Sequence, residues 1–236
     1  MSDAEQRSRI RGVVFDKDGT LFDFNATWGA WAAEVIKTET KGDPENRSSL
    51  AQVLGFDLAT GTFLETSIVI ASPAADIARA AMPFLADTSV DVVLNRWNTL
   101  AAKAPQVEAT PLQPFVERLK RAGLKLGVAT NDAEYPARAH LKEAGVEEAF
   151  EFIAGSDSGF GSKPETGQLM AFCDATGLHP RECVMVGDST HDLHAGRAAG
   201  MKTVAVLTGV AGKDELAPFS DVVLPSIAQL PDWLEL

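Results

Sequence analysis

The chain has 236 residues, of which 33 are acidic and 21 are basic, giving a net charge of −12 at pH 7. This length is ample for one sizeable core, or for a core domain with a smaller insert. The negative charge disfavours a nucleic-acid partner, because binding to a phosphate backbone is driven by lysine and arginine side chains that displace counterions. A small anionic substrate is compatible with it, since a bound metal and a few local donors can reverse the field within one cleft.

The sequence carries no export or membrane signal that we can identify. Residues 1–9 are polar and lack the apolar centre of a signal peptide, and no apolar run approaches the length of a membrane span. The two cysteines, Cys173 and Cys183, fit no metal-binding spacing and are interpreted as ordinary reduced thiols. We therefore expect a soluble, cytoplasmic protein without a membrane partner.

The first predicted element is a strand over residues 10–15. This apolar run is interrupted only by Arg11 and Gly12, which is typical of a central parallel strand covered on both faces. It ends in two carboxylates, Asp16 and Asp18, followed by Gly19, which permits a sharp turn. Ligands of open α/β sheets bind outside the carboxyl ends of the strands. Taken alone, the pattern favours the plainer interpretation of two solvated loop carboxylates, so later segments have to decide.

Residues 23–105 read as a mainly helical insert. Helices are predicted at 25–38, 46–54, 74–81 and 90–102. The segment 55–70 is ambiguous, since the turn at Thr60-Gly61 makes a small hairpin conceivable and 68–70 is a β-like run. Trp28 and Trp31 fall at helical spacing and are interpreted as the core of a small bundle rather than a ligand cage.

From residue 110 onward strands and helices alternate. Strands are predicted at 124–129, 152–154, 183–186, 203–207 and 221–224, and helices at 111–122, 133–144, 164–176, 189–199 and 227–234. Such alternation with short connections predicts an α/β fold, a Rossmann-like doubly wound parallel sheet with an inserted, mainly helical domain. The predicted domains are a core of residues 1–22 and 106–236 and an insert of residues 23–105.

Polar side chains follow several of these strands. Thr130 and Asn131 come after the second strand of the core, and Asp188 follows a later one with Asp192 one helical turn on. Neighbouring strands lie about 4.8 Å apart, so these side chains can converge with Asp16 and Asp18. Clustered carboxylates without a cation would cost stability, which indicates Mg²⁺ or a similar hard cation.

Lys163 precedes Pro164, which is predicted to begin a helix and to place the lysine in an extended conformation over the same crevice. Each residue also has a plain structural interpretation. Thr130 or Asp188 could cap a helix, Asp192 could be an exposed acid near a helix N-terminus, and Lys163 could be solvated. His191 and His194 are interpreted as exposed helix residues.

Four segments resemble, in chain order, the four motifs of the haloacid dehalogenase superfamily: Asp16-Lys17-Asp18-Gly19-Thr20-Leu21, Val128-Ala129-Thr130-Asn131, Lys163-Pro164 and Gly187-Asp188-Ser189-Thr190-His191-Asp192. The insert corresponds in position to the cap domain of that superfamily. Within it, the chain looks like the phosphoglycolate-phosphatase-like branch with a helical cap.

The resemblance implies Mg²⁺-dependent hydrolysis of a small phosphomonoester, phosphoglycolate-like or a sugar phosphate, through an aspartyl-phosphate. Asp16 is then the nucleophile, and Asp18 is the general acid and base. Mg²⁺ is expected on Asp16, the Asp18 carbonyl and Asp188, with Asp192 as a ligand, through water, or as a partner of Lys163. Thr130, the Asn131 amide and Lys163 are expected to bind the phosphoryl oxygens, with Thr130 and Lys163 also contributing to catalysis.

Two residues depart from the family pattern. Lys17 replaces an apolar residue and is expected to put a positive charge near the site entrance, and Thr166 stands where many relatives have a second proline. Asp18 favours phosphoryl transfer over dehalogenation.

Three alternatives stay open: a sugar phosphomutase, a phosphonate hydrolase and a non-catalytic binding module. The phosphonate hydrolase requires a cap lysine, for which only Lys37, Lys41 and Lys103 are available. A cap arginine, Arg79 or Arg96, is a candidate for binding a substrate carboxylate.

Overall fold

The computed structural model describes residues 10–64, 66–70, 72–86 and 89–236. Residues 1–9, on which the expectation of no signal peptide rests, lie outside the described residues. Within the described residues, no helix combines the length and the apolar character needed to cross a lipid bilayer.

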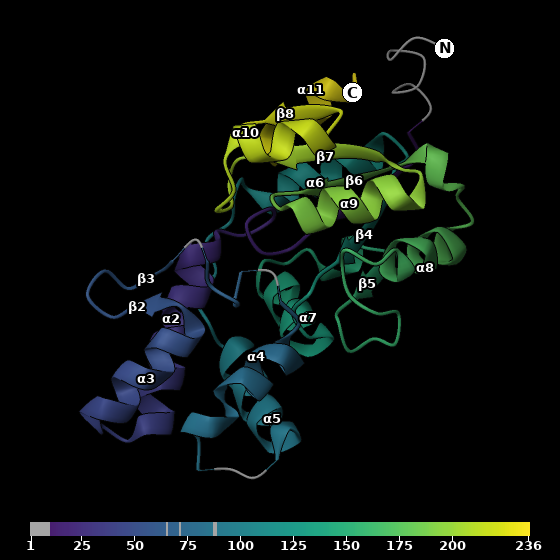
Figure 1. Cartoon of the computed structure of the whole chain (residues 1–236). Coiled ribbons are helices and arrows are strands. Elements are labelled where there is room, and N and C mark those ends of the chain that lie inside the picture. The colour runs from purple at the N-terminus through teal and green to yellow at the C-terminus, as the bar shows by residue number, and fades with distance from the viewer. Residues whose placement is uncertain (1–9, 65, 71, 87–88) are drawn as a thin grey trace.

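The core is a six-stranded parallel sheet with the order β5-β4-β1-β6-β7-β8 (Figure 1). Its strands are β1 (Gly12–Phe15), β4 (Lys125–Ala129), β5 (Phe152–Ala154), β6 (Cys183–Gly187), β7 (Lys202–Val206) and β8 (Val222–Leu224). β1 is central, and Phe15 pairs with Val128 of β4 and Val186 of β6. The residues that follow these three strands therefore leave the sheet at the same level.

Helices cover both faces of the sheet: α6 (Leu112–Arg121), α7 (Glu134–Glu143), α8 (Gly167–Thr176), α9 (Thr190–Ala199), α10 (Lys213–Leu216) and α11 (Leu230–Trp233). Val13 and Phe15 of β1 pack with Leu112 and Leu119 of α6, whereas Val14 packs with Phe172 of α8 on the opposite face. Side chains alternate between the faces of a strand, so a strand covered on both faces is apolar throughout. The predicted doubly wound α/β fold is confirmed.

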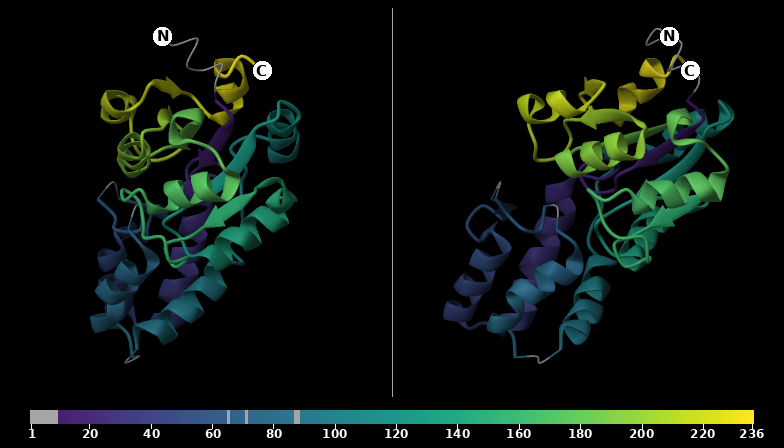
Figure 2. Two further views of the ribbon diagram at one scale, coloured as in Figure 1. Left: turned by 90° about the vertical axis from the view of Figure 1, so that its right-hand side faces the viewer. Right: turned by 45° about the vertical axis from the view of Figure 1, so that its right-hand side comes forward.

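The segment between β1 and α6 forms a helical insertion with its own apolar core. It contains α2 (Phe24–Thr40), α3 (Pro44–Leu54), a hairpin of β2 (Phe56–Asp57) and β3 (Thr62–Phe63), α4 (Ala74–Ala81), the short 3₁₀ helix η1 (Met82–Phe84) and α5 (Val90–Ala101). Trp28, Trp31 and Trp97 pack edge to face inside it, as predicted for core tryptophans. Figure 2 shows the insertion as a second lobe beside the sheet. The domain boundaries given above remain our prediction.

Two local predictions were wrong. Residues 68–70 form turns rather than a β-like strand. The helix expected from Pro164 begins at Gly167, because the side chain of Asn131 accepts a hydrogen bond from the Lys163 amide and donates one to the Lys163 carbonyl. These bonds hold residue 163 in a loop, and the Lys163–Pro164 peptide bond is cis.

Candidate active site

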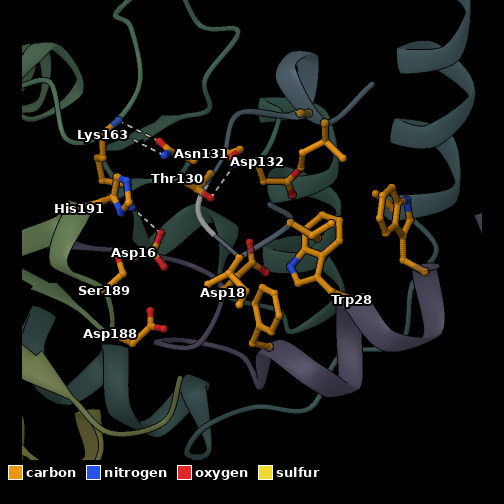
Figure 3. Close-up of a pocket in the computed structure, with 18 of the residues that line it drawn as sticks. Asp16, Asp18, Trp28, Thr130, Asn131, Asp132, Lys163, Asp188, Ser189 and His191 are labelled. Carbon is orange, nitrogen blue, oxygen red and sulfur yellow. Dashed lines mark hydrogen bonds and ion pairs between the residues drawn. The ribbon is translucent and has the colours of Figure 1, made fainter. Parts of the chain in front are cut away.

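The end of β1 presents two carboxylates to one pocket. The Asp16 amide donates a hydrogen bond of 2.8 Å to the Val186 carbonyl and so extends the sheet by one residue. The chain then turns at Gly19, which has a φ of +83°, and a Cβ atom there would lie 2.6 Å from Cγ of Asp188. Only glycine fits this turn. Asp16 and Asp18 consequently both line the pocket drawn in Figure 3.

The end of β6 supplies Asp188 and Asp192. Ser189, not Asp188, caps α9, and its backbone amide and hydroxyl donate hydrogen bonds to Oδ2 of Asp192 at 3.0 and 2.7 Å. This capping box turns the Asp192 carboxylate back toward the sheet. The side chain is 1% exposed, so it is not a solvated acid. Asp188 is also buried, and its Oδ1 accepts a hydrogen bond from Thr20.

Lys163 joins the two groups of carboxylates. Its Nζ lies 2.5 Å from Oδ1 of Asp16 and 2.6 Å from Oδ1 of Asp192, and the residue is 4% exposed. Burial alone would lower the pKa of this ammonium, but the two carboxylates outweigh burial and raise the pKa above its ordinary value. The solvated-lysine interpretation is therefore wrong, and Lys163 is a fixed positive charge inside the site.

Thr130 and Asn131 follow β4 beside this lysine. The buried Thr130 amide donates a hydrogen bond to Ala154, and its hydroxyl accepts one from the Asp132 amide. Asn131 holds the backbone of Lys163 through both ends of its amide side chain. Both residues line the pocket with Asp16 and Lys163, so their predicted convergence at one edge of the sheet is present. Their roles in catalysis and binding are taken up below as a proposal.

The buried carboxylates form a candidate cation site. Oxygens of Asp16, Asp188 and Asp192 lie within 4.8 Å of one another. Burial, with the neighbouring carboxylates, raises the pKa of Asp16 to about 7 despite Lys163, and raises the pKa of Asp188 well above its ordinary value. A hard cation with oxygen ligands would favour the ionised forms. Because both oxygens of Asp192 already have partners, Asp16 and Asp188 are the better candidates to touch it.

A loop that the sequence analysis did not single out closes over Asp188. The Thr208 hydroxyl donates a hydrogen bond of 2.6 Å to the Gly19 carbonyl. A Cβ atom at Gly209 would lie 1.7 Å from Oδ2 of Asp188, so a side chain at this position cannot be accommodated. The segment after β7 thus shapes the site together with the turn after β1.

Lys17 does not lie at the site entrance, and that expectation was wrong. Its side chain is fully buried, with Nζ 2.6 Å from Oδ1 of Asp18 and 3.2 Å from Oδ2 of Asp132. The side chain extends toward α7, where His140 contacts its ammonium. Burial alone would lower the pKa of Lys17, but Asp18 and Asp132 raise it. Lys17 is a buried counter-charge for both carboxylates.

His140 of α7 completes this group and connects the core to the insertion. Its Nε2 lies 2.8 Å from the carbonyl of Ala101 at the end of α5, and its Nδ1 lies 3.1 Å from Nζ of Lys17. A carbonyl only accepts, so Nε2 carries the hydrogen and Nδ1 accepts from the lysine. Burial, with the charge of Lys17, lowers the pKa of His140 to about 4. The imidazole is therefore neutral at pH 7.

The neutral His140 predicts a pH-dependent stability. Between its ordinary pKa of 6.5 and the folded value of about 4, the unfolded chain binds a proton that the folded chain does not, so the free energy of unfolding falls as the pH falls through this window. Urea unfolding should show that the free energy of unfolding falls between pH 7.5 and pH 5 by about 2 kcal/mol more in the native chain than in His140→Gln.

The variant is needed as a reference because burial raises the pKa of Asp132 to about 6. A carboxyl with a raised pKa increases the free energy of unfolding as the pH falls, which is opposite to the effect of His140. Glutamine can donate to Ala101 and accept from Lys17 without titrating. Equal losses for the two proteins between pH 7.5 and pH 5 would contradict a neutral, buried His140.

The pocket has a volume of about 750 Å³, open to solvent, and lies between the end of the sheet and the insertion. His191 lines it and is half-buried, so its assignment as an exposed residue was wrong, whereas His194 is exposed. The cap arginines do not line it. Arg96 forms two bonds of 2.8 Å to Glu39, and the exposed Arg79 pairs with Asp76. Lys37, Lys41 and Lys103 are exposed and line no part of it.

Comparison with known proteins agrees with this geometry. The family model described as haloacid dehalogenase-like hydrolase matches residues 13–206. A phosphoglycolate phosphatase of Xanthomonas campestris pv. campestris (strain 8004) is 30% identical over 222 residues, which cover 93% of this chain and 94% of that protein. The crystal structure of a predicted phosphoglycolate phosphatase from Haemophilus somnus 129pt superposes with a TM-score of 0.72 at 19% identity, covering 95% of this chain and 98% of that one.

A crystal structure of CbbY from Rhodobacter sphaeroides in complex with phosphate has a TM-score of 0.69 at 18% identity, covering 96% of this chain and 100% of that one. At this identity the likeness establishes the shared fold. It is the second solved structure that matches the arrangement of sheet and helical insertion described above.

Proposed function

Since the chain belongs to the haloacid dehalogenase-like hydrolase family, we propose that it is a Mg²⁺-dependent phosphatase of small phosphomonoesters, working through an aspartyl-phosphate. The observation that carries the proposal is the convergence of the buried Asp16 and Lys163 with the half-buried Asp18 at the end of the central strands. The printed name of the Xanthomonas relative makes phosphoglycolate one test substrate, and sugar phosphates are another. The substrate is expected to be a small cytoplasmic metabolite.

In the first step, a carboxylate oxygen of Asp16 attacks phosphorus while the bond from phosphorus to the alcohol oxygen breaks. Asp18 gives its proton to the departing alcohol. Oδ1 of Asp18 is held by Lys17, so Oδ2 is the oxygen available to carry that proton. In the second step Asp18 takes a proton from the water that attacks the aspartyl-phosphate, releasing phosphate and restoring Asp16.

Lys163 and Thr130 are proposed to hold the phosphoryl oxygens. Nζ of Lys163 already lies against Asp16, so a phosphoryl group on Asp16 is formed next to a fixed positive charge, which stabilises developing negative charge. Asn131 keeps Lys163 in place and offers its backbone amide. Asp16, Asp188 and the Asp18 carbonyl would hold Mg²⁺, with Asp192 as a ligand, as a ligand through water, or as the partner of Lys163. The ion would supply further positive charge to stabilise the phosphoryl group.

The test is phosphate release from phosphoglycolate, sugar phosphates and other small monoesters, with Mg²⁺ and with a chelator. We expect release that requires Mg²⁺. Transfer of phosphate between two sugar hydroxyls without release would instead favour the phosphomutase. No turnover of any phosphomonoester would favour the binding module. The exposed cap lysines give the phosphonate hydrolase no candidate for its amine within the described residues.

Metal binding should also be visible without activity. Saturating Mg²⁺ is expected to raise the melting temperature by several degrees, since a ligand at about 100 times its Kd adds about 2.7 kcal/mol to the free energy of unfolding. Asp188→Asn removes a proposed ligand and should abolish this Mg²⁺-dependent shift. Replacing Asp174, which is exposed on α8, by asparagine should leave it intact. An equal shift in all three proteins would contradict a metal at Asp188.

A further inference from the structure

The insertion presents an apolar wall to the pocket. Its lining side chains come from α2, α4, α5 and the segment before α4, and they include Phe24, Trp28, Trp31, Ile77, Leu94 and Trp97. Among the described residues, Ser72 and Asn98 are the polar side chains on this wall. A wall of this kind binds apolar groups by removing their surface from water.

The indole groups of the wall differ in what they offer a ligand. The Trp31 N–H donates to the Trp97 carbonyl and the Trp97 N–H donates to Glu39, so both are used within the insertion. The Trp28 ring lies over the ammonium of Lys17, with Nζ 5.4 Å from its centroid. Its indole nitrogen faces Asp18 in Figure 3. Trp28 therefore borders the space next to Asp18, where the departing alcohol has to lie.

The charges of the pocket disfavour a second negative charge on the substrate. Five carboxylates line it, those of Asp16, Asp18, Asp132, Asp188 and Asp192. Among the described residues, Lys163 is the only lysine or arginine that lines it. Lys163 is already paired with two of these carboxylates. Lys17, buried behind the pocket, is likewise paired with Asp18 and Asp132, and the phosphate would take up the charge of the proposed cation. No positive charge is then left for a carboxylate in the alcohol portion, which would also lose its hydration against the wall.

Building on the proposed phosphatase function, we propose that the pocket selects phosphomonoesters whose alcohol portion is uncharged and apolar, of the size of an aromatic ring, packed against Trp28. A carboxylate-bearing alcohol such as glycolate is disfavoured. The three lining residues Trp28, Ile77 and Leu94 offer such a ring apolar surface from three different helices of the insertion.

Two non-hydrolysable phosphonates give a matched test, because they differ only in the end of a two-carbon chain. 2-Phenylethylphosphonate carries a phenyl group and 3-phosphonopropionate carries a carboxylate. Calorimetric titration in Mg²⁺ is expected to give a Kd at least tenfold lower for the phenyl compound, a difference of about 1.4 kcal/mol. Equal binding, or tighter binding of the carboxylate, overturns the proposal.

Hydrolysis assays distinguish the proposed selectivity for an apolar alcohol portion from the proposed phosphatase activity. Benzyl phosphate should have a higher kcat/KM than phosphoglycolate, and both leave as alkyl alcohols. If neither is hydrolysed while the phenyl phosphonate still binds more tightly, the phosphatase proposal fails and the selectivity of the pocket stands. If phosphoglycolate is the better substrate and its analogue the tighter ligand, the phosphatase proposal stands and the selectivity is overturned.

A charge placed on the wall gives the converse test. Asn98→Arg puts a cation on α5 where it lines the pocket, and should tighten 3-phosphonopropionate at least tenfold relative to the phenyl compound. Asn95→Arg makes the same change three residues earlier on the exposed side of α5, outside the lining, and should leave the preference unchanged. No change in Asn98→Arg, or the same change in both variants, contradicts an alcohol portion bound at this wall.

Discussion

Asp16→Asn is expected to lower kcat on any phosphomonoester that the chain hydrolyses by at least about 10³-fold, because a carboxamide does not form the acyl phosphate on which both steps depend. The substitution keeps the size of the side chain. Lys163 retains its bond of 2.6 Å to Asp192, so the fold is expected to persist. The measurement is phosphate release under saturating substrate and Mg²⁺, with the melting curve of the variant as its control.

The control matters because Asp16 is buried beside other acids. Burial and the neighbouring carboxylates raise its pKa, so a neutral amide relieves repulsion, and the metal-free variant should melt at or above the temperature of the native chain. A variant that melts normally and keeps a tenth or more of the native kcat would exclude Asp16 as the nucleophile.

Lys17→Met is expected to lower both the free energy of unfolding and kcat. Removing one partner of a buried ion pair costs about 3–5 kcal/mol, because the remaining charge is left unpaired, and here Asp18 and Asp132 both lose the same ammonium. Asp18 would no longer be held by the bond to its Oδ1, and kcat should fall by about 10²-fold, the usual contribution of general acid–base catalysis at its lower end.

A second variant separates the two effects. Lys17→Met combined with Asp132→Asn leaves one uncompensated carboxylate instead of two, so the free energy of unfolding should partly recover. The kcat should stay low, because Asp18 is still without its anchor. A double variant no more stable than Lys17→Met, or one that regains activity together with stability, would contradict the role assigned to Lys17.

The strands and the polar residues at their ends could be predicted from the sequence because local rules determine them. The apolar run before Asp16 requires cover on both faces, and Ser189 and Asp192 stand at the spacing of a capping box. Asp132 carried a usable signal, since it comes directly after Thr130 and Asn131 at the end of β4.

Other features depend on which elements pack together, and the sequence alone does not give this. Lys17 was expected at the site entrance, whereas α7 buries its side chain and offers His140 there, which is a tertiary fact. A lone histidine in a helix carries no signal of its own. Likewise, Arg96 is occupied by Glu39, 57 residues away in the chain, so its availability to a substrate could not be judged from composition.

The hydrogen bond from Thr208 to Gly19 has a consequence for how the protein is made. It joins residues 189 positions apart, the bond from Thr20 to Asp188 spans 168, and that from Lys163 to Asp16 spans 147. Contacts of such sequence separation form late, because the loop they close must first be ordered. Asp16 and Asp18 are synthesised early, and the residues that surround them are complete only when nearly the whole chain has been made. A truncated chain that ends before residue 209 therefore lacks part of the site.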